Sequence, residues 1–243
     1  MSEVCISIVS HAQSFLANQL LDDLGRNCPD VDLIFTSNID EPSPLDFRLW
    51  PRVTHLINSS PKGFGSNHNA AFRHCTATYF CVVNPDIRIT SNPFPEMLAV
   101  MDDTKIGVVA PKVLSPSGGI EDNARFFPTP FGLLQKALGI EDGCFPVAGT
   151  QPMSVDWVAG MFLLFRADAF ASIGGFDEKF FLYYEDVDIC ARLWRTGKKV
   201  VVIPNVSVVH DAQRMSRKNL RYMTWHLGSM VRYFSKHLWR LPR

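Results

Sequence analysis

The strongest constraint on the fold is an alternation of short apolar runs with helical patterns in the first half of the chain. The runs VCISIVS, VDLIFTS, THLIN and YFCVVN are rich in β-branched and aromatic residues, which is typical of strands. Between them lie an apolar helical stripe over residues 15–24 and a second helical stretch near residues 66–75. This alternation of strands and helices predicts a doubly wound α/β fold, in which helices cover both faces of a mostly parallel sheet.

Polar residues follow the predicted strands. Ser10 and His11 come at the end of the first strand, and Ser37 and Asn38 at the end of the second. The residues NPD at 84–86 come at the end of the apolar run YFCVVN. Ligands of such sheets bind beyond the carboxyl ends of the strands. These positions are therefore the first candidates for a binding site.

Composition narrows the class of protein. The 243 residues suffice for one large α/β domain or two small ones. The 24 basic residues balance the 24 acidic ones, so we expect no nucleic-acid partner.

The first ten residues lack a basic leader, which predicts a cytoplasmic protein. The longest strongly apolar stretch, residues 157–165, is far shorter than the roughly 20 residues that cross a bilayer. Six cysteines without a CxxC pair favour free thiols.

The pattern loosens between residues 111 and 152, where glycine and proline are frequent. We interpret this stretch as a loop-rich insertion or flap within one domain, because enough Phe and Leu remain for it to pack. Regular elements return with VDWVAGMFLLF, a short helix, an acidic segment that opens another helix, and the strand KKVVVIP. We therefore predict a single domain over residues 1–212, followed by a basic amphipathic helical segment over residues 213–243.

Two short motifs have the composition of binding sites. Asn84 and Asp86 lie two apart at a strand end, so both oxygens could approach one divalent ion, although an Asx turn explains them equally simply. PKGFGSNHNAAF, at residues 61–72, has two glycines and a lysine before a helix, which could present backbone N–H groups to a phosphate or a base. It matches neither a Walker loop nor GxGxxG, and a flexible strand-to-helix turn is the alternative.

A third motif, GFDEKFFLYYEDVDICARLW at residues 175–194, sets carboxylates among aromatic side chains. Its five acids are Asp177, Glu178, Glu185, Asp186 and Asp188. A helix start explains Glu185 and Asp186, because the helix macrodipole favours negative charge there. It does not explain the aromatic crowding, whereas a general base near neutral pH benefits from a partly desolvated setting. The residues alone leave both explanations open.

The chain resembles the family-2 glycosyltransferases, within their rhamnosyltransferase-like group. The resemblance rests on four motifs in one order: PKGFGSNHNAAF, CVVNPDIRI, VDWVAGMFLLFRADAFASIGGFDE and the acidic segment. It implies a GT-A fold and transfer of a sugar from a nucleotide diphosphate, usually with inversion. It also implies that Asp86 and His210 bind Mg²⁺ or Mn²⁺ and that Asp186 is the base that deprotonates the acceptor.

We predict that the nucleotide binds where the turns after the first strands converge. The residues expected near it are Ser10, Asn38, Lys62, Gly63, Gly65, Asn69, Asn84 and Asp86. Two departures from the family pattern stand out. The second strand ends in IFTSNIDE, where the family commonly has an acid for the base or ribose, and the first position of the DxD motif is the neutral Asn84.

The resemblance implies that the acceptor is a glycan or a lipid-linked glycan of the bacterial surface, with rhamnose from dTDP-rhamnose as the candidate donor sugar. Two other functions fit less well. A sugar-nucleotidyltransferase would need a glycine-rich, basic loop after the first strand, which IVSHAQSF lacks. A non-catalytic nucleotide-sugar or glycan-binding relative would explain Asn84 but not the retained Asp86, Asp186 and His210.

The last part of the chain is basic. No acid follows Asp211, while arginines, lysines, aromatics and leucines alternate to the end. A basic amphipathic helix of this kind can lie on an anionic membrane surface, which would place the enzyme at the inner face of the membrane. The alternative is a helix that packs on the sheet and exposes a solvated basic face.

Overall fold

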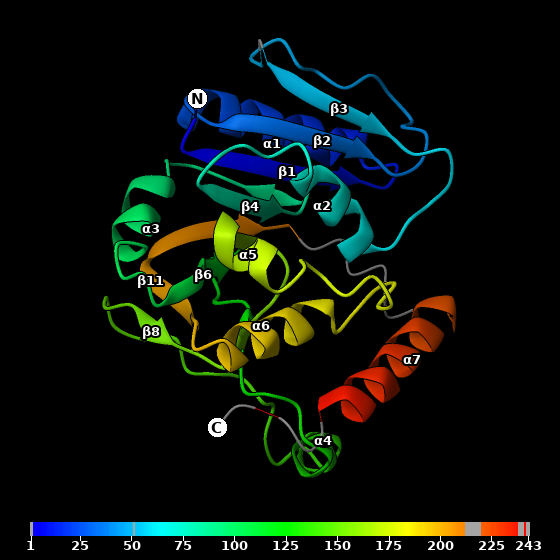
Figure 1. Cartoon of the computed structure of the whole chain (residues 1–243), viewed down its shortest axis with the longest axis vertical. Helices are drawn as coiled ribbons and strands as arrows, with labels where there is room; N and C mark the ends of the chain where they lie inside the picture. The colour runs from blue at the N-terminus through cyan, green and yellow to red at the C-terminus, as the bar shows by residue number, and fades with distance from the viewer. Residues whose placement is uncertain (1, 51, 212–219, 238–240, 242–243) are drawn as a thin grey trace.

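The structure is a computed structural model that describes residues 2–50, 52–211, 220–237 and 241. Half of its central sheet is parallel and runs in the order β3, β2, β1, β4 (Figure 1). These strands are β3 (Val53–Ile57), β2 (Asp32–Ser37), β1 (Val4–Ser10) and β4 (Tyr79–Val83). Because β2 and β3 lie on one side of β1 and β4 lies on the other, a topological switch point falls between β1 and β4.

The second half of the sheet contains the antiparallel pairings. β10 (Phe162–Arg166) runs antiparallel to β4 and to β6 (Ile106–Leu114). β11 (Lys199–His210) is parallel to β6 and antiparallel to both β5 (Ile87–Arg88) and β8 (Met153–Ser154). A separate pair joins β7 (Ala124–Arg125) to β9 (Trp157–Val158).

Helices cover both faces of the sheet, which confirms the predicted architecture (Figure 1). α1 (Ser14–Asn27) and α3 (Phe94–Val100) pack into the apolar cluster on one face. α2 (Phe64–Phe72), α5 (Ala167–Ser172) and α6 (Glu185–Arg195) pack into the cluster on the other. Neighbouring residues of one strand serve different faces, as in β4, where Cys81 faces the first cluster and Val82 the second.

The two segments predicted to lie outside the regular fold have helices of their own. Within residues 111–152, β6 continues to Leu114 and α4 (Pro130–Ala137) is capped by Thr129, whose side chain accepts the Gly132 N–H at 2.9 Å. α7 (Leu220–His237) follows residues 212–219, so the predicted boundary at 212/213 lies outside the described residues. No helix among the described residues has both the length and the apolar character needed to span a bilayer.

Candidate active site

The predicted acids lie at the carboxyl edge of the sheet, because the loop after β4 and the start of α6 both contact residues 160–161 there. The Asn84 N–H donates to the Met161 carbonyl at 2.9 Å, and the neighbouring Gly160 N–H donates to Asp186 Oδ2 at 3.1 Å. The residues that follow β4 and the first turn of α6 are therefore joined through the same short segment. On the other side, His210 at the end of β11 pairs with Ile87. The structure thus brings Asp86, His210 and Asp186 to one edge.

Asp86 and His210 form a partly buried pair. His210 Nε2 lies 3.3 Å from Asp86 Oδ2, and His210 Nδ1 lies 3.7 Å from Glu121 Oε2. Burial alone would lower the pKa of His210, but the two neighbouring carboxylates outweigh it and raise that pKa above its usual value of 6.5. Asp86 Oδ1 is buried without a hydrogen-bond partner. Such an orphaned oxygen is an available ligand atom.

This pair fits a divalent cation that is shared with a substrate. Mg²⁺ takes one or two protein ligands and completes its shell with water and phosphate oxygens, so it does not need an all-protein cage. Among the described residues no three acidic, histidine or cysteine side chains converge on a common point. Glu121 faces the opposite ring nitrogen of His210, so it is placed to orient the imidazole rather than to join the same ligand set.

Asp186 is the acid of the α6 first turn that faces this edge. Its Oδ1 accepts the Val187 N–H at 2.8 Å, its Oδ2 accepts the Gly160 N–H, and the side chain stays partly exposed. Burial raises the pKa of Asp186, although the bonds from Val187 and Gly160 and the charge of Arg125 oppose that rise. A carboxylate with a raised pKa and an accessible position has the properties of a general base.

The other two acids of this turn point elsewhere. Glu185 is buried, and its burial and the charge of Asp186 raise its pKa well above the usual range. Asp188 is fully buried and contacts α7, where its Oδ1 accepts from His237 Nε2 at 2.6 Å and from Lys236 Nζ at 2.7 Å. The helix start therefore contains one acid that faces the edge, one that is enclosed and one that forms ion pairs.

The glycines of PKGFG make close contact with the aromatic part of the acidic segment. A Cβ on Gly63 would lie 2.6 Å from the Phe181 carbonyl oxygen, and one on Gly65 would lie 2.6 Å from Phe176 Cβ. The Phe64 N–H donates to the Phe181 carbonyl at 3.0 Å, so this peptide occupies part of the N-terminus of α2. These glycines thus allow two segments to pack closely, and a direct nucleotide contact at them stays a prediction.

Asn69 belongs to the same contact. Its side chain accepts the Phe176 N–H at 2.9 Å and donates to the Phe176 carbonyl at 2.9 Å and to Glu178 Oε1 at 3.0 Å. Gly175 must be glycine here, because its φ is +68° and a Cβ would lie 2.4 Å from Asn69 Oδ1. Asn69 therefore fixes the start of the acidic segment.

Asn38 links the first strands to the lysine loop. Its backbone N–H donates to the Ser10 carbonyl at 2.8 Å. Its side-chain oxygen accepts the Lys62 N–H at 2.8 Å, and its side-chain nitrogen donates to the Lys62 carbonyl at 2.9 Å. Ser10, Asn38 and Lys62 are thus brought together beyond β1 and β2, with the Lys62 side chain exposed.

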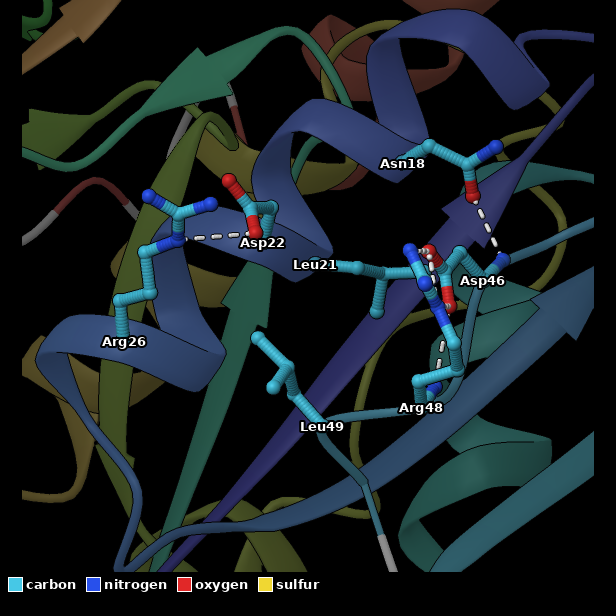
Figure 2. Close-up of a pocket in the computed structure, with 7 residues that line it drawn as sticks. All are labelled: Asn18, Leu21, Asp22, Arg26, Asp46, Arg48 and Leu49. Atoms are coloured by element: carbon cyan, nitrogen blue, oxygen red, sulfur yellow. Dashed lines mark hydrogen bonds and ion pairs between the residues drawn. The ribbon is translucent and has the colours of Figure 1, made fainter.

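Two hollows open on the surface near the first strands. The one shown in Figure 2, of about 300 Å³, lies between α1 and residues 46–49, and none of the predicted site residues is among the seven that line it. The other, of about 500 Å³, lies beyond β2 and β3 and is lined by Ser37, His55, Ile57, Phe47 and the segment 39–45. Both carboxylate oxygens of Glu41, which also lines it, are buried without a hydrogen-bond partner.

Comparison with known proteins identifies the family. The sequence profile of "Glycosyl transferase family group 2" matches residues 86–240, which is more than half of the chain. The chain belongs to this family. It is therefore a nucleotide-sugar-dependent glycosyltransferase, as the motifs predicted. The match includes Asp86, Asp186 and His210.

Individual relatives agree with this assignment. Rhamnosyltransferase WbbL of Escherichia coli K12 is 27% identical over 247 residues, which align 96% of this chain with 93% of that protein. An N-acetylglucosaminyl-diphospho-decaprenol L-rhamnosyltransferase of Mycobacterium tuberculosis H37Rv is 29% identical over 264 residues, with 96% and 83% covered.

Solved structures confirm the GT-A fold of the glycosyltransferase. GalNAc-T7 with UDP, GalNAc and Mn²⁺ superposes with a TM-score of 0.69 at 15% identity, over 89% of this chain and 44% of that one. The mannosyltransferase PcManGT of Pyrobaculum calidifontis with GDP-Man and Mn²⁺ gives 0.66 at 15%, over 97% and 64%. The chain thus spans less than two thirds of either protein.

In this glycosyltransferase α7 packs along the acidic segment rather than on the sheet. Ser229 Oγ donates to the Leu182 carbonyl at 2.9 Å, and the rings of His226 and Tyr233 both pack on Tyr184. Tyr183 and Tyr184 have left-handed φ values of 70° and 66°, which cost a non-glycine residue roughly 1 kcal/mol or more. α7 therefore supports the strained turn that leads into Asp186.

Sequence reasoning did not find several residues of this site. Glu121, Arg125 and Gly160 lie beside the predicted acids, yet only Gly160 stands in a motif that the family shares. Glu121 and Arg125 belong to the loop-rich segment, whose path cannot be derived from local patterns. An acid next to an apolar β-bridge residue, as in GIED, is the only available signal for Glu121.

Proposed function

We propose that this glycosyltransferase moves a sugar, with inversion, from a nucleotide diphosphate donor to an acceptor hydroxyl, and that Asp186 is the general base. One observation carries the proposal: Asp186 is an accessible carboxylate with a raised pKa on the same edge as the Asp86–His210 pair. The acceptor hydroxyl gives its proton to Asp186 while its oxygen bonds to the anomeric carbon, and the bond from that carbon to the diphosphate breaks.

Asp86 and His210 would hold Mg²⁺ or Mn²⁺ in this proposal. The cation, when bound, would neutralise the negative charge that develops on the departing diphosphate. The buried, unpartnered Asp86 Oδ1 supports the assignment. The Mn²⁺ in the structures of GalNAc-T7 and PcManGT supports it by analogy of fold. The cofactor in this proposal is a divalent metal, and Asn84 would add a neutral oxygen near it.

The nucleotide would lie across the switch point, in contact with Ser10, Asn38 and Lys62. The exposed Lys62 side chain is suited to a phosphate, and the two hydrogen bonds between the Asn38 side-chain amide and the Lys62 backbone fix the residue that carries it. We assign the nucleoside to the adjoining 500 Å³ hollow, where the hydroxyl and N–H donors of a ribose and a pyrimidine would satisfy Glu41. Gly63, Gly65 and Asn69 would shape this site by packing the acidic segment beside it.

The names of the relatives support a more specific role. Rhamnosyltransferase WbbL and the mycobacterial rhamnosyltransferase point to rhamnose, with dTDP-rhamnose as the donor. The second name also points to an acceptor on a polyprenyl diphosphate. We expect the product to enter lipopolysaccharide or another surface polysaccharide. Such an acceptor would be met in the cytoplasm at the inner face of the membrane, with the basic segment over residues 213–243 near anionic lipid.

The test compares wild type with Asp186→Asn and Glu178→Gln over a panel of nucleotide sugars, with and without Mn²⁺. Asp186→Asn keeps the size of the side chain but cannot take a proton, so transfer should fall by roughly 10² to 10⁴ with little change in donor affinity. Glu178 is exposed and bonds to Ser66 and Asn69, so its variant should retain transfer.

The other outcomes are as informative. Near-normal transfer by Asp186→Asn would refute the assignment of the base. Donor binding by the wild type without transfer or hydrolysis would favour the non-catalytic binding protein. Formation of a nucleotide sugar from a nucleoside triphosphate and a sugar phosphate would favour the nucleotidyltransferase.

A further inference from the structure

Helix α4 exposes an apolar face that nothing in the described chain covers. Phe131 is 68% exposed, Leu134 is 55% and Leu138 is 65%, and their spacing of three and four residues sets them on one side of the helix. No residue of α4 is buried. An isolated helix of eight residues is marginal in water without a packed face. The helix therefore has the properties of an element whose partner lies outside the described residues.

Helix α7 carries a second exposed apolar stripe. Its inner side contains Ser229, Tyr233 and other residues that face the acidic segment. Met223, Leu227 and Val231 recur every four residues on another side and are exposed. α7 is thus apolar on two sides, and among the described residues only one of them is packed.

The two helices that carry these exposed residues are neighbours in the fold. Phe127, just before α4, packs in the same apolar cluster as Met230 and Phe234 of α7. Burial and the charge of Lys136 on α4 both lower the pKa of His226 on α7, so these two side chains are neighbours as well. Figure 1 shows α4 beside the C-terminal end of α7. We call the six exposed residues Phe131, Leu134, Leu138, Met223, Leu227 and Val231 the α4–α7 surface.

We infer that the α4–α7 surface inserts into the interface of a bilayer that contains anionic lipids. Its charges fit that occupant: α7 carries the exposed Arg221 and Arg232 and has no acid over residues 220–237, and Lys136 adds an exposed cation on α4. Apolar side chains flanked by cations are typical of helices that lie in a membrane interface. A second copy fits less well, because two-fold symmetry would set one basic α7 against the other.

The position of the surface relative to the site supports the same occupant. The inner side of α7 supports the turn that leads into Asp186, so the outer side would hold the bilayer close to the carboxylate. This step rests on the proposed function, since only a membrane-anchored acceptor needs that proximity. The bilayer contact would then present a lipid-linked acceptor to Asp186 without removing it from the membrane.

The test is co-sedimentation of the full-length protein with vesicles, in the absence of donor and acceptor. The vesicles are phosphatidylcholine alone or phosphatidylcholine mixed with phosphatidylglycerol. Wild type should bind the mixed vesicles, and the double variant Leu134→Gln/Leu138→Gln should bind them at least about tenfold more weakly, since each leucine loses its apolar contact with lipid. Phe15→Gln/Ile57→Gln, which changes two equally exposed residues on α1 and β3, should bind like wild type.

A charge variant provides a second measurement that does not alter an apolar residue. Arg232→Glu should weaken binding to the mixed vesicles, and the loss should shrink as salt rises. Equal binding of the leucine double variant and wild type would overturn the inference, and so would a wild type that binds neither kind of vesicle. A wild-type dimer that the leucine variant converts to monomer, with vesicle binding unchanged, would assign the surface to a second copy. None of these results depends on transfer, so the proposed function is tested separately.

Discussion

The buried charge of Asp188 gives a prediction whose magnitude follows from the contacts. Asp188 is fully buried and accepts from Arg192 Nε at 2.7 Å, from Lys236 Nζ at 2.7 Å and from His237 Nε2 at 2.6 Å. The variant Asp188→Asn keeps the volume of the side chain and removes its charge. It leaves Arg192 and Lys236 beside a neutral group, and Lys236 keeps only Asp177 as a counter-charge, at 2.6 Å.

Breaking a buried ion pair by removing one partner costs about 3–5 kcal/mol. Arg192 and Lys236 keep 15% and 30% of their side-chain surface exposed, so solvent relieves part of that cost. We expect a loss of about 3 kcal/mol in the free energy of unfolding at pH 7, toward the lower end of that range. For a chain of this size the corresponding drop in melting temperature is about 6–12 °C.

The pH dependence has a defined sign. Burial alone would raise the pKa of Asp188, but the bond from His237 and the charges of Arg192 and Lys236 outweigh it and lower the pKa from 3.8 to about 2. A lowered folded-state pKa gives stability that is present above about pH 4 and is lost as the pH falls toward 2. The difference between wild type and Asp188→Asn should therefore shrink over that window.

Thermal and urea unfolding at a series of pH values measure both effects. Asp177→Asn is the matched control, because Asp177 is only half-buried and bonds to Lys236 alone among the cations, so its loss should cost less than about 1 kcal/mol. Hydrogen exchange should show α7 opening in Asp188→Asn before the central sheet does. A variant that melts within a degree or two of wild type at pH 7 would refute the assignment of Asp188 as the anchor of α7.

Two further predictions concern the donor site. Asp86→Ala should weaken Mn²⁺-dependent donor binding at least about tenfold. The unfolding midpoint should stay nearly unchanged, since one Asp86 oxygen has no hydrogen-bond partner in the fold. Calorimetry with Mn²⁺ and with EDTA measures the donor binding, and equal wild-type activity in EDTA would contradict the prediction. Glu41→Gln should raise the melting temperature, because it removes a negative charge whose two oxygens are buried without a hydrogen-bond donor, and it should weaken donor binding. Unchanged donor affinity would remove Glu41 from the site.

Much of the fold could be predicted because strand and helix patterns are local. The alternation in the first half fixes β1 to β4 and the helices between them, and the GT-A fold confirms it. The antiparallel direction of β10 could not be derived, because an apolar run has the same composition in either direction. The stretch WVAGMFLLF reads as one strand but divides into β9 and β10 around Gly160, whose N–H is then available to Asp186.

The candidate site was less predictable because it depends on which segments cover one another. Strand ends point to Ser10, Asn84 and Asp86 through topology alone. The glycines at 63 and 65 have the composition of a phosphate loop, yet in the fold they lie against Phe181 and Phe176. Contacts between distant segments leave no local pattern in the sequence, so this use of the glycines could not be foreseen.

The acids of the aromatic segment differ in role because successive helix positions point in different directions. Each residue of α6 turns the side chain by about 100°, so Asp186 points away from Glu185 and Asp188, which lie three residues apart on one side of the helix. Glu185 points into the enclosed interior, Asp186 reaches Gly160 at the edge, and Asp188 reaches His237 on α7. The helix dipole favours all three charges, and the surroundings then separate them. The aromatic rings in the turn before Asp186 mainly form the surface on which α7 packs, as the contact of Tyr233 with Tyr184 shows. The aromatic segment that surrounds Asp186, the proposed base, is therefore also where the C-terminal helix supports the turn that leads into it.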